Sequence, residues 1–236
     1  GEAEDDRSGS SVSLSSDGSL VAIGAYRNNG SGDKAGHVRI YDWDGMNWTQ
    51  VGADIDGEAA SDYSGYSVSL SSDGSRVAIG SPYNEGNGAL AGHVRLFDWD
   101  GLNWTQVGAD IDGEAEEDRS GSSVSLSSDG SLVAIGAYFN DGSGDKAGHV
   151  RIYDWNGMNW TQVGADIDGE AAVDLSGLGV SISSDGSRVA IGSPYNDGNG
   201  DDAGHTRVFS LRVPVAVAPA PAAPQAYRGP APSGIS

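Results

Sequence analysis

The stretch Ser8–Tyr26, SGSSVSLSSDGSLVAIGAY, has the pattern of a β-hairpin. Serine alternates with apolar residues through Val12 and Leu14, and a period of two is typical of a strand with one buried face. Asp17-Gly18 separates this run from a second apolar run, Leu20–Ile23. Asp-Gly between two such runs favours a tight turn, because glycine accepts a positive φ. The stretch therefore predicts two antiparallel strands.

The hairpin returns in three further copies, at Ser64–Tyr83, Ser120–Tyr138 and Ser176–Tyr195. The repeats begin at Gly1, Gly57, Gly113 and Gly169, so that each begins 56 residues after the one before. A period of this size indicates a solenoid, a propeller or an array. We divide the chain into repeats 1–56, 57–112, 113–168 and 169–217, with a tail at 218–236.

Each repeat contains sequence for two more strands after the hairpin. In the first repeat these are His37–Trp43, which alternates again, and Trp48–Val51, with a turn between them and an acidic connector after them. No segment has helical periodicity. Four short antiparallel strands per repeat are typical of a propeller blade, so we expect an all-β, propeller-like fold of four four-stranded antiparallel blades.

The fourth repeat departs from this pattern. It lacks the Asp-Trp turn and the Asn-Trp-Thr strand, and continues instead as Arg212–Val217, which could form a short edge strand. We expect the last blade to be completed either by this C-terminal segment or by a neighbouring chain. The tail from Ala218 is rich in proline and alanine and predicts extended or disordered chain.

Composition restricts the partners. The 236 residues carry 34 acidic and 13 basic side chains, a formal net charge of -21, which makes nucleic acid an unfavourable partner. Cysteine is absent, and no apolar run reaches the about 20 residues of a membrane span, so we expect no membrane insertion. The chain opens at Gly1 without an initiator methionine or signal sequence, which favours a piece cut from a longer precursor.

At the hairpin and the loop after it, the sequence resembles the FG-GAP repeats of integrin α-chain propellers. The matching elements in the second repeat are Ser64–Val68, then Val77–Pro82, and then Ala91–Phe97. Serine stands where the family has phenylalanine in every copy, and Tyr26 and Tyr138 stand where it has proline. The resemblance implies a propeller.

The resemblance also implies a calcium loop between the first two strands, but the residues for it are missing. Each copy has a single carboxylate there, at Asp17, Asp73, Asp129 and Asp185. A hard cation needs several converging oxygen ligands, so we expect the family's calcium site to be absent.

A second acidic cluster recurs in the connectors, where alternate carboxylates point to one side of an extended chain and could share a calcium ion. The alternatives are a solvated acidic rim and aspartates that cap backbone amides. The candidate metal ligands are Asp54, Asp56, Glu58, Asp62, Asp110, Asp112, Glu114, Asp118, Asp166, Asp168, Glu170 and Asp174.

The four histidines, His37, His93, His149 and His205, occupy one repeat position, which favours a structural role because a catalytic site needs different residues in different roles. No catalytic constellation departs from the repeat, so we expect no enzyme. The paired tryptophans, such as Trp43 and Trp48, could stack across a hairpin or form platforms for sugars.

Glycosylation motifs also follow the repeat. Asn-x-Ser/Thr acceptors lie at Asn47, Asn103, Asn159 and Asn29. The tail is similar to the Ala-Pro glycomodules of algal and plant cell-surface proteins, which implies hydroxylated and O-glycosylated prolines at Pro219, Pro221 and Pro224; the alternative is a plain spacer.

From these features we expect a non-enzymatic, extracellular or cell-surface structural glycoprotein. It would assemble with copies of itself into a fibre or surface layer through edge strands and tail, because neither end carries a capping repeat. The alternative is a cell-surface adhesion or carbohydrate-binding propeller whose binding depends on calcium.

Overall fold

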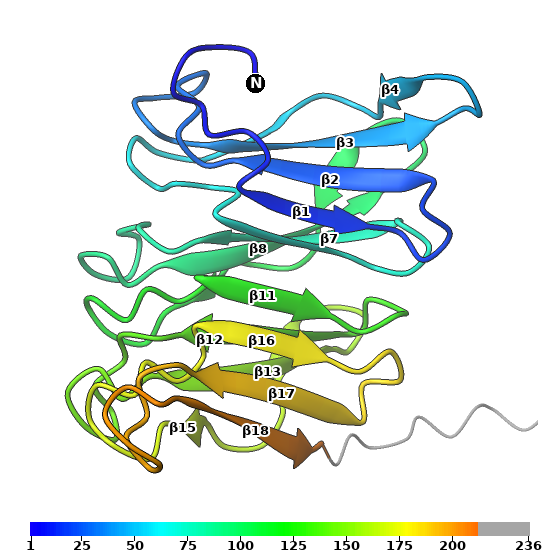
Figure 1. Cartoon of the computed structure of the whole chain (residues 1–236). Helices are drawn as coiled ribbons and strands as arrows, with labels where there is room; N and C mark the ends of the chain where they lie inside the picture. Colours follow the sequence, from blue (N-terminus) through cyan, green and yellow to red (C-terminus); the bar gives the residue numbers. More distant parts are fainter. Residues whose placement is uncertain (212–236) are drawn as a thin grey trace, which may run out of the picture.

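The computed structural model describes residues 1–211, in which four antiparallel sheets lie one below another in chain order (Figure 1). The first sheet contains β1 (Ser11–Leu14), β2 (Leu20–Ala25), β3 (His37–Trp43), β4 (Trp48–Gln50) and β5 (Ile55–Asp56). The second contains β6 (Ser67–Leu70), β7 (Arg76–Ser81), β8 (His93–Trp99), β9 (Trp104–Gln106) and β10 (Ile111–Asp112). The third contains β11 (Ser123–Leu126), β12 (Leu132–Ala137), β13 (His149–Trp155), β14 (Trp160–Gln162) and β15 (Ile167–Asp168). The fourth contains β16 (Gly179–Ile182), β17 (Arg188–Ser193) and β18 (His205–Ser210).

The hairpin of each repeat forms as its sequence predicts. In the first sheet, β1 pairs with β2 so that Leu14 lies opposite Val21, and the turn is closed by the Ser15 amide, which donates to the Leu20 carbonyl at 2.9 Å. Trp43 and Trp48 lie opposite each other with ring centroids 5.4 Å apart, which confirms the cross-strand interpretation of the tryptophan pairs. No helix occurs in residues 1–211, and the all-β, propeller-like fold is confirmed.

The connector differs from the sequence-based expectation. We expected four strands per repeat, but each of the first three sheets has a fifth short strand, such as β5, formed by connector residues. β4 pairs with the end of β3 and β5 with its beginning, where Ile55 lies opposite Val38. Ile55 is buried in the core, so its apolar side chain draws the acidic connector back onto the sheet.

The cores lie between neighbouring sheets. Val38 and Ile40 of the first sheet pack against Val68 and Leu70 of the second, and the same arrangement recurs between the second and third sheets and between the third and fourth. The second and third sheets therefore bury both faces, and the first and fourth sheets bury one face each, as in the stacked blades of a propeller.

Serine hydroxyls join the first strands of neighbouring sheets. Ser13 Oγ accepts a hydrogen bond from the Leu70 amide at 2.9 Å, and Ser11 Oγ accepts one from the Val68 amide at 3.0 Å. Ser69 and Ser125 make the same contact with the next sheet. The alternating Ser-apolar pattern thus places polar side chains where they satisfy the outward amides of the next sheet.

Close approach between sheets requires glycine at one pair of positions. A Cβ on Gly24 would lie 2.0 Å from the Gly65 carbonyl oxygen, and Gly65 itself has φ +81. The glycine at the start of each hairpin after the first, such as Gly65, therefore packs against the preceding sheet.

The fourth sheet has three strands within the described residues, and the chain is followed to Leu211. The predicted strand Arg212–Val217 and the tail lie outside those residues, as do Pro219, Pro221 and Pro224. In residues 1–211 no helix is long and apolar enough to cross a membrane.

Candidate functional site

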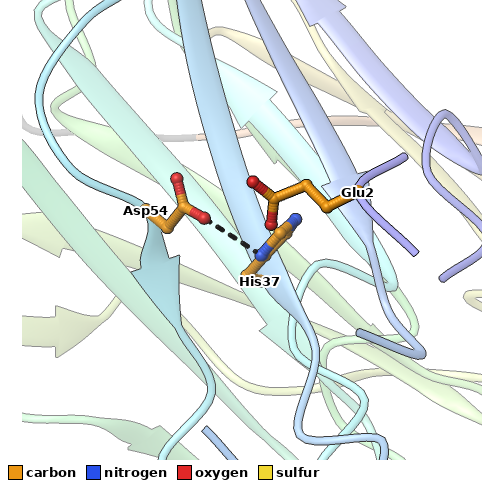
Figure 2. A group of neighbouring side chains, drawn as sticks. All are labelled: Glu2, His37 and Asp54. Atoms are coloured by element: carbon orange, nitrogen blue, oxygen red, sulfur yellow. Dashed lines mark ion pairs between the residues drawn. The ribbon is translucent and has the colours of Figure 1, made fainter. Parts of the chain in front are cut away.

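The histidine at the start of the third strand of a repeat lies between two carboxylates. In the first repeat these are Glu2 and Asp54, whose carboxylates approach the His37 ring from two sides (Figure 2). The same arrangement recurs twice, and in each cluster the three candidate ligand atoms lie within 4.8 Å of one another. The clusters consist of Glu2, His37 and Asp54; Glu58, His93 and Asp110; and Glu114, His149 and Asp166.

The strand pairing positions these side chains. His93 opens β8 and lies opposite Asp112 of β10, so that Asp110 enters the cluster from the residues just before β10. Glu58 belongs to the connector that leads into the same repeat. The His93 side chain is 1% exposed, and its Nδ1 lies 3.8 Å from Asp110 Oδ2 and 4.0 Å from Glu58 Oε2. Both distances exceed hydrogen-bond length.

Each carboxylate is held through its other oxygen. Gln106 donates to Asp110 Oδ1 at 2.6 Å, and Arg95 Nη1 lies 3.4 Å from Glu58 Oε1. The first and third clusters repeat both contacts, with Gln50 and Gln162 on the aspartates and with Arg39 and Arg151 on the glutamates. The oxygens that face the histidine are therefore the ones left without a protein donor.

Burial favours the neutral form of two of the histidines. It lowers the pKa of His93 and of His149 below the usual range, and the neighbouring Arg95 or Arg151 lowers it further, against the opposing effect of the two carboxylates. A neutral imidazole has a free nitrogen lone pair, which is the form that binds a metal ion.

The other predicted metal ligands lie elsewhere. Asp62 is buried and accepts a hydrogen bond from the Ala59 amide at 2.9 Å. Asp118 and Asp174 make equivalent contacts with the amides of Ala115 and Ala171, and each also accepts from an asparagine side chain. These three aspartates thus occupy the capping role that the sequence left open as an alternative.

The junctions between repeats use the backbone carbonyls of three connector aspartates. The carbonyl of Asp56 accepts a hydrogen bond from Arg95 Nη2 at 2.7 Å, and the carbonyls of Asp112 and Asp168 accept one from Arg151 and Arg207. Burial and the nearby Asp54 raise the pKa of Asp56. Glu170 lies 3.6 Å from His205 in the fourth repeat, where no third candidate ligand joins them within the described residues.

The predicted N-glycosylation acceptors are accessible. Asn47, Asn103 and Asn159 lie in the turns between the third and fourth strands and are exposed, as is Asn29 in its loop.

The two outermost faces of the stack form a second candidate site. Val12 and Leu14 on β1 are 61% and 60% exposed, whereas their counterparts Val68 and Leu70 are each 7% exposed because the first sheet covers them. At the other end, Val208 on β18 is 64% exposed. These apolar side chains occupy positions that are buried between sheets elsewhere in the stack, so their exposure marks an interaction surface.

A groove of about 600 Å³ lies on the free face of the fourth sheet. It is lined by residues that include Gly192, Pro194 and Gly204. In the first repeat, the corresponding Gly24 and Gly36 contact Gly65 and Ser64, the first residues of the next hairpin. The groove is therefore the position that a following Ser-Gly segment fills elsewhere in the stack.

Comparisons with known proteins place the fold but give no family. No protein-family model and no curated protein matches the sequence. A putative 6-phosphogluconolactonase from Bacteroides uniformis matches with TM-score 0.57 at 14% identity, over 85% of this chain and 49% of that one. Hydrazine synthase from Kuenenia stuttgartiensis matches with TM-score 0.51 at 14% identity, over 89% and 51%. These likenesses show the fold alone, and the chain spans about half the length of both structures.

The first of these structures corrects one expectation. The prediction that the chain is not an enzyme is wrong, because a protein with this fold carries the name of a lactonase. We made that prediction because no group of candidate catalytic residues departs from the repeat pattern. Residues at repeated positions can still form a cluster of titratable side chains, as the Glu-His-Asp clusters do.

Sequence reasoning also missed the histidines as site residues. Their identical positions suggested a structural role, and their partners lie 35 residues before and 17 residues after them, as with Glu58, His93 and Asp110. This spacing is constant in three repeats and was the available signal.

Proposed function

We propose that the chain is a repeat-built scaffold that binds a second copy of itself through its first and fourth sheets. One observation carries the proposal. The uncovered faces of the first and fourth sheets are the same two kinds of face that pack against each other between neighbouring sheets inside the stack. The first sheet presents the apolar face that sheets two to four bury, and the fourth sheet presents the groove that receives a following repeat.

The contacts within the chain specify how the copies would meet. Ser181 occupies the position of Ser69 and Ser125 but is exposed, and the Leu14 amide occupies the position of the amides that those serines bind. Ser8-Gly9 of one copy would fill the groove beside Gly204 of the other. Gly9 now has no atom within 4 Å of a built Cβ, unlike Gly65, Gly121 and Gly177.

Two copies would close a ring of eight sheets. The same contact would form twice, from the fourth sheet of each copy to the first sheet of the other, which leaves no free face. The coverage of about half of each matched structure supports an arc of this extent. Burying a side chain such as Leu14 contributes about 1.5–3 kcal/mol, and the net charge of -21 makes the association depend on salt.

We further propose an extracellular or cell-surface location and N-linked glycans at Asn47, Asn103 and Asn159. Their exposed turns lie away from the packed sheet faces and support this assignment. We also assign the repeats to the FG-GAP type, supported by the position of Gly80-Ser81-Pro82 at the end of the buried strand β7.

The exposed tryptophans favour a second candidate function, carbohydrate binding. Trp43 and Trp48 are 41% and 45% exposed, and a cleft between the first and second repeats brings Trp104 together with Asp56 and Arg95. Stacking on an aromatic ring beside polar groups is a common way to bind a sugar. Glycan-array binding with and without calcium tests it: chelator-sensitive binding is expected, and an unbound array excludes this function.

Sedimentation velocity of the Leu14→Glu variant tests the scaffold function. A carboxylate at this position would meet the apolar face of the other copy, so we expect the variant to sediment as a single chain while the unchanged protein sediments as a pair. Met46→Glu is the matched control, because Met46 is 79% exposed at the tip of a turn, and we expect it to remain a pair. Equal behaviour of both variants contradicts the proposal.

A further inference from the structure

The three Glu-His-Asp clusters have the construction of metal sites. Each offers one imidazole nitrogen and two carboxylate oxygens from three separate segments of the chain, as with His93, Glu58 and Asp110. We propose that each cluster binds a divalent transition-metal ion of the zinc type, with three protein ligands and the remaining position open to water.

The separation of the ligand atoms supports a shared ion. Zinc lies about 2.0–2.2 Å from nitrogen and carboxylate oxygen ligands, so two ligands of one ion lie about 3–4 Å apart. His93 Nδ1 lies 3.8 Å from Asp110 and 4.0 Å from Glu58, and His149 Nδ1 lies 3.8 Å from Asp166 and 3.9 Å from Glu114. These distances are too long for hydrogen bonds but suit two ligands on one ion.

The buried histidine is the observation that separates these clusters from an acidic surface patch. Its side chain is 1% exposed in the second and third repeats, and Nδ1 points toward the two carboxylates. Within residues 1–211, Nε2 of His93 and of His149 has no hydrogen-bond partner, so the ring makes no competing polar contact through that atom. Nδ1 is the ring atom that a cation lying between the two carboxylates would meet.

The contacts of the two carboxylates match those of metal ligands. Metal-binding carboxylates are usually oriented by a donor on the oxygen that faces away from the metal. Gln106 holds the outer oxygen of Asp110, and Arg95 lies beside the outer oxygen of Glu58. The two inner oxygens are thereby directed at His93. Recurrence in three repeats gives three sites per chain.

The ligand set also selects the class of cation. Calcium takes oxygen ligands, whereas imidazole suits zinc and neighbouring transition metals. The clusters therefore differ from the calcium site proposed for the connector carboxylates alone. His205 provides an internal control, because no third candidate ligand joins His205 and Glu170 in residues 1–211, and residues 212–236 contain no aspartate, glutamate, histidine or cysteine.

Nuclear magnetic resonance of the four histidines tests the proposal. The ¹⁵N-labelled full chain is titrated with zinc chloride at neutral pH, with excess magnesium present to occupy loose carboxylate sites. We expect the Nδ1 resonances of His37, His93 and His149 to shift and to saturate at three zinc ions per chain, while those of His205 stay in place. Unshifted imidazoles, or an equal shift at His205, would overturn it.

A pair of variants separates specific from diffuse binding. Glu58→Gln removes a ligand, and we expect calorimetry to give two zinc ions per chain instead of three. Glu85→Gln makes the same change on an exposed loop of the same repeat and should leave three. Circular dichroism checks that both variants fold. A stoichiometry of three in both would overturn the proposal, and neither result depends on whether the chain pairs with a second copy.

Discussion

The Leu70 amide donates a hydrogen bond to Ser13 Oγ at 2.9 Å and so joins the first strands of the first and second sheets. The contact is one instance of a rule that runs through the stack. A serine hydroxyl of one sheet accepts a hydrogen bond from a backbone amide of the next sheet, and the two sheets bury apolar side chains around this contact. The first and fourth sheets each keep one face that no other sheet covers.

Removing such a hydroxyl should destabilise the chain only where a following sheet is present. We expect Ser125→Ala to lower the free energy of unfolding by about 1–3 kcal/mol, because the Ile182 amide is then left without its partner. Ser181→Ala is the control at the equivalent, exposed position and should leave the stability of the dissociated chain unchanged. Urea denaturation measures both. Equal losses would show that these hydroxyls do not join sheets.

Glycine at the junctions gives a second matched pair. A Cβ on Gly121 would lie 2.5 Å from the His93 carbonyl oxygen, whereas a Cβ on Gly9 would meet nothing within 4 Å, and both residues have positive φ. In the dissociated chain we expect Gly121→Ala to cost several kcal/mol or to prevent folding, and Gly9→Ala to cost only the about 1–2 kcal/mol of the backbone conformation. Thermal unfolding compares them. A Gly121→Ala variant as stable as Gly9→Ala would mean that the sheets do not approach as closely as described.

The tryptophan that begins the fourth strand of a repeat also contacts the preceding sheet, and its substitution tests that junction. Trp160 donates from Nε1 to the Val107 carbonyl at 2.9 Å, across the junction between the second and third sheets. We expect Trp160→Phe to lower the free energy of unfolding by about 0.5–1.5 kcal/mol through the lost hydrogen bond. Trp48→Phe changes the same repeat position on the uncovered first sheet, and a smaller loss is expected there. Chemical denaturation of the two variants decides the matter, and a reversed order contradicts the prediction.

Much of this organisation could be predicted from the sequence. The period of 56 residues, the Asp17-Gly18 turn and the alternation around Val12 and Leu14 specify the strands locally, because each depends on neighbours in the chain. The sites depend on contacts between segments. Glu58 and Asp110 meet at His93 only because β10 pairs with β8, and the connector carries too little alternation to predict that short strand.

The turn aspartates should make stability depend on acid pH. The Ser19 amide and hydroxyl and the Ser15 hydroxyl donate to Asp17, which lowers its pKa from 3.8 to about 2. Stability from this group is complete above pH 3.8 and is lost as the pH falls toward about 2, because protonation then weakens the hydrogen bonds. We expect Asp17→Asn to show a shallower decline in the free energy of unfolding between pH 5 and pH 2. Parallel pH profiles for the two proteins would contradict this role.

Electron microscopy of the purified chain at physiological salt tests both uncovered faces in one measurement. Pairing of the first and fourth sheets predicts closed rings of eight blades, built from two chains of 24.1 kDa each. Open arcs of four blades at every protein concentration, or linear filaments, would contradict it.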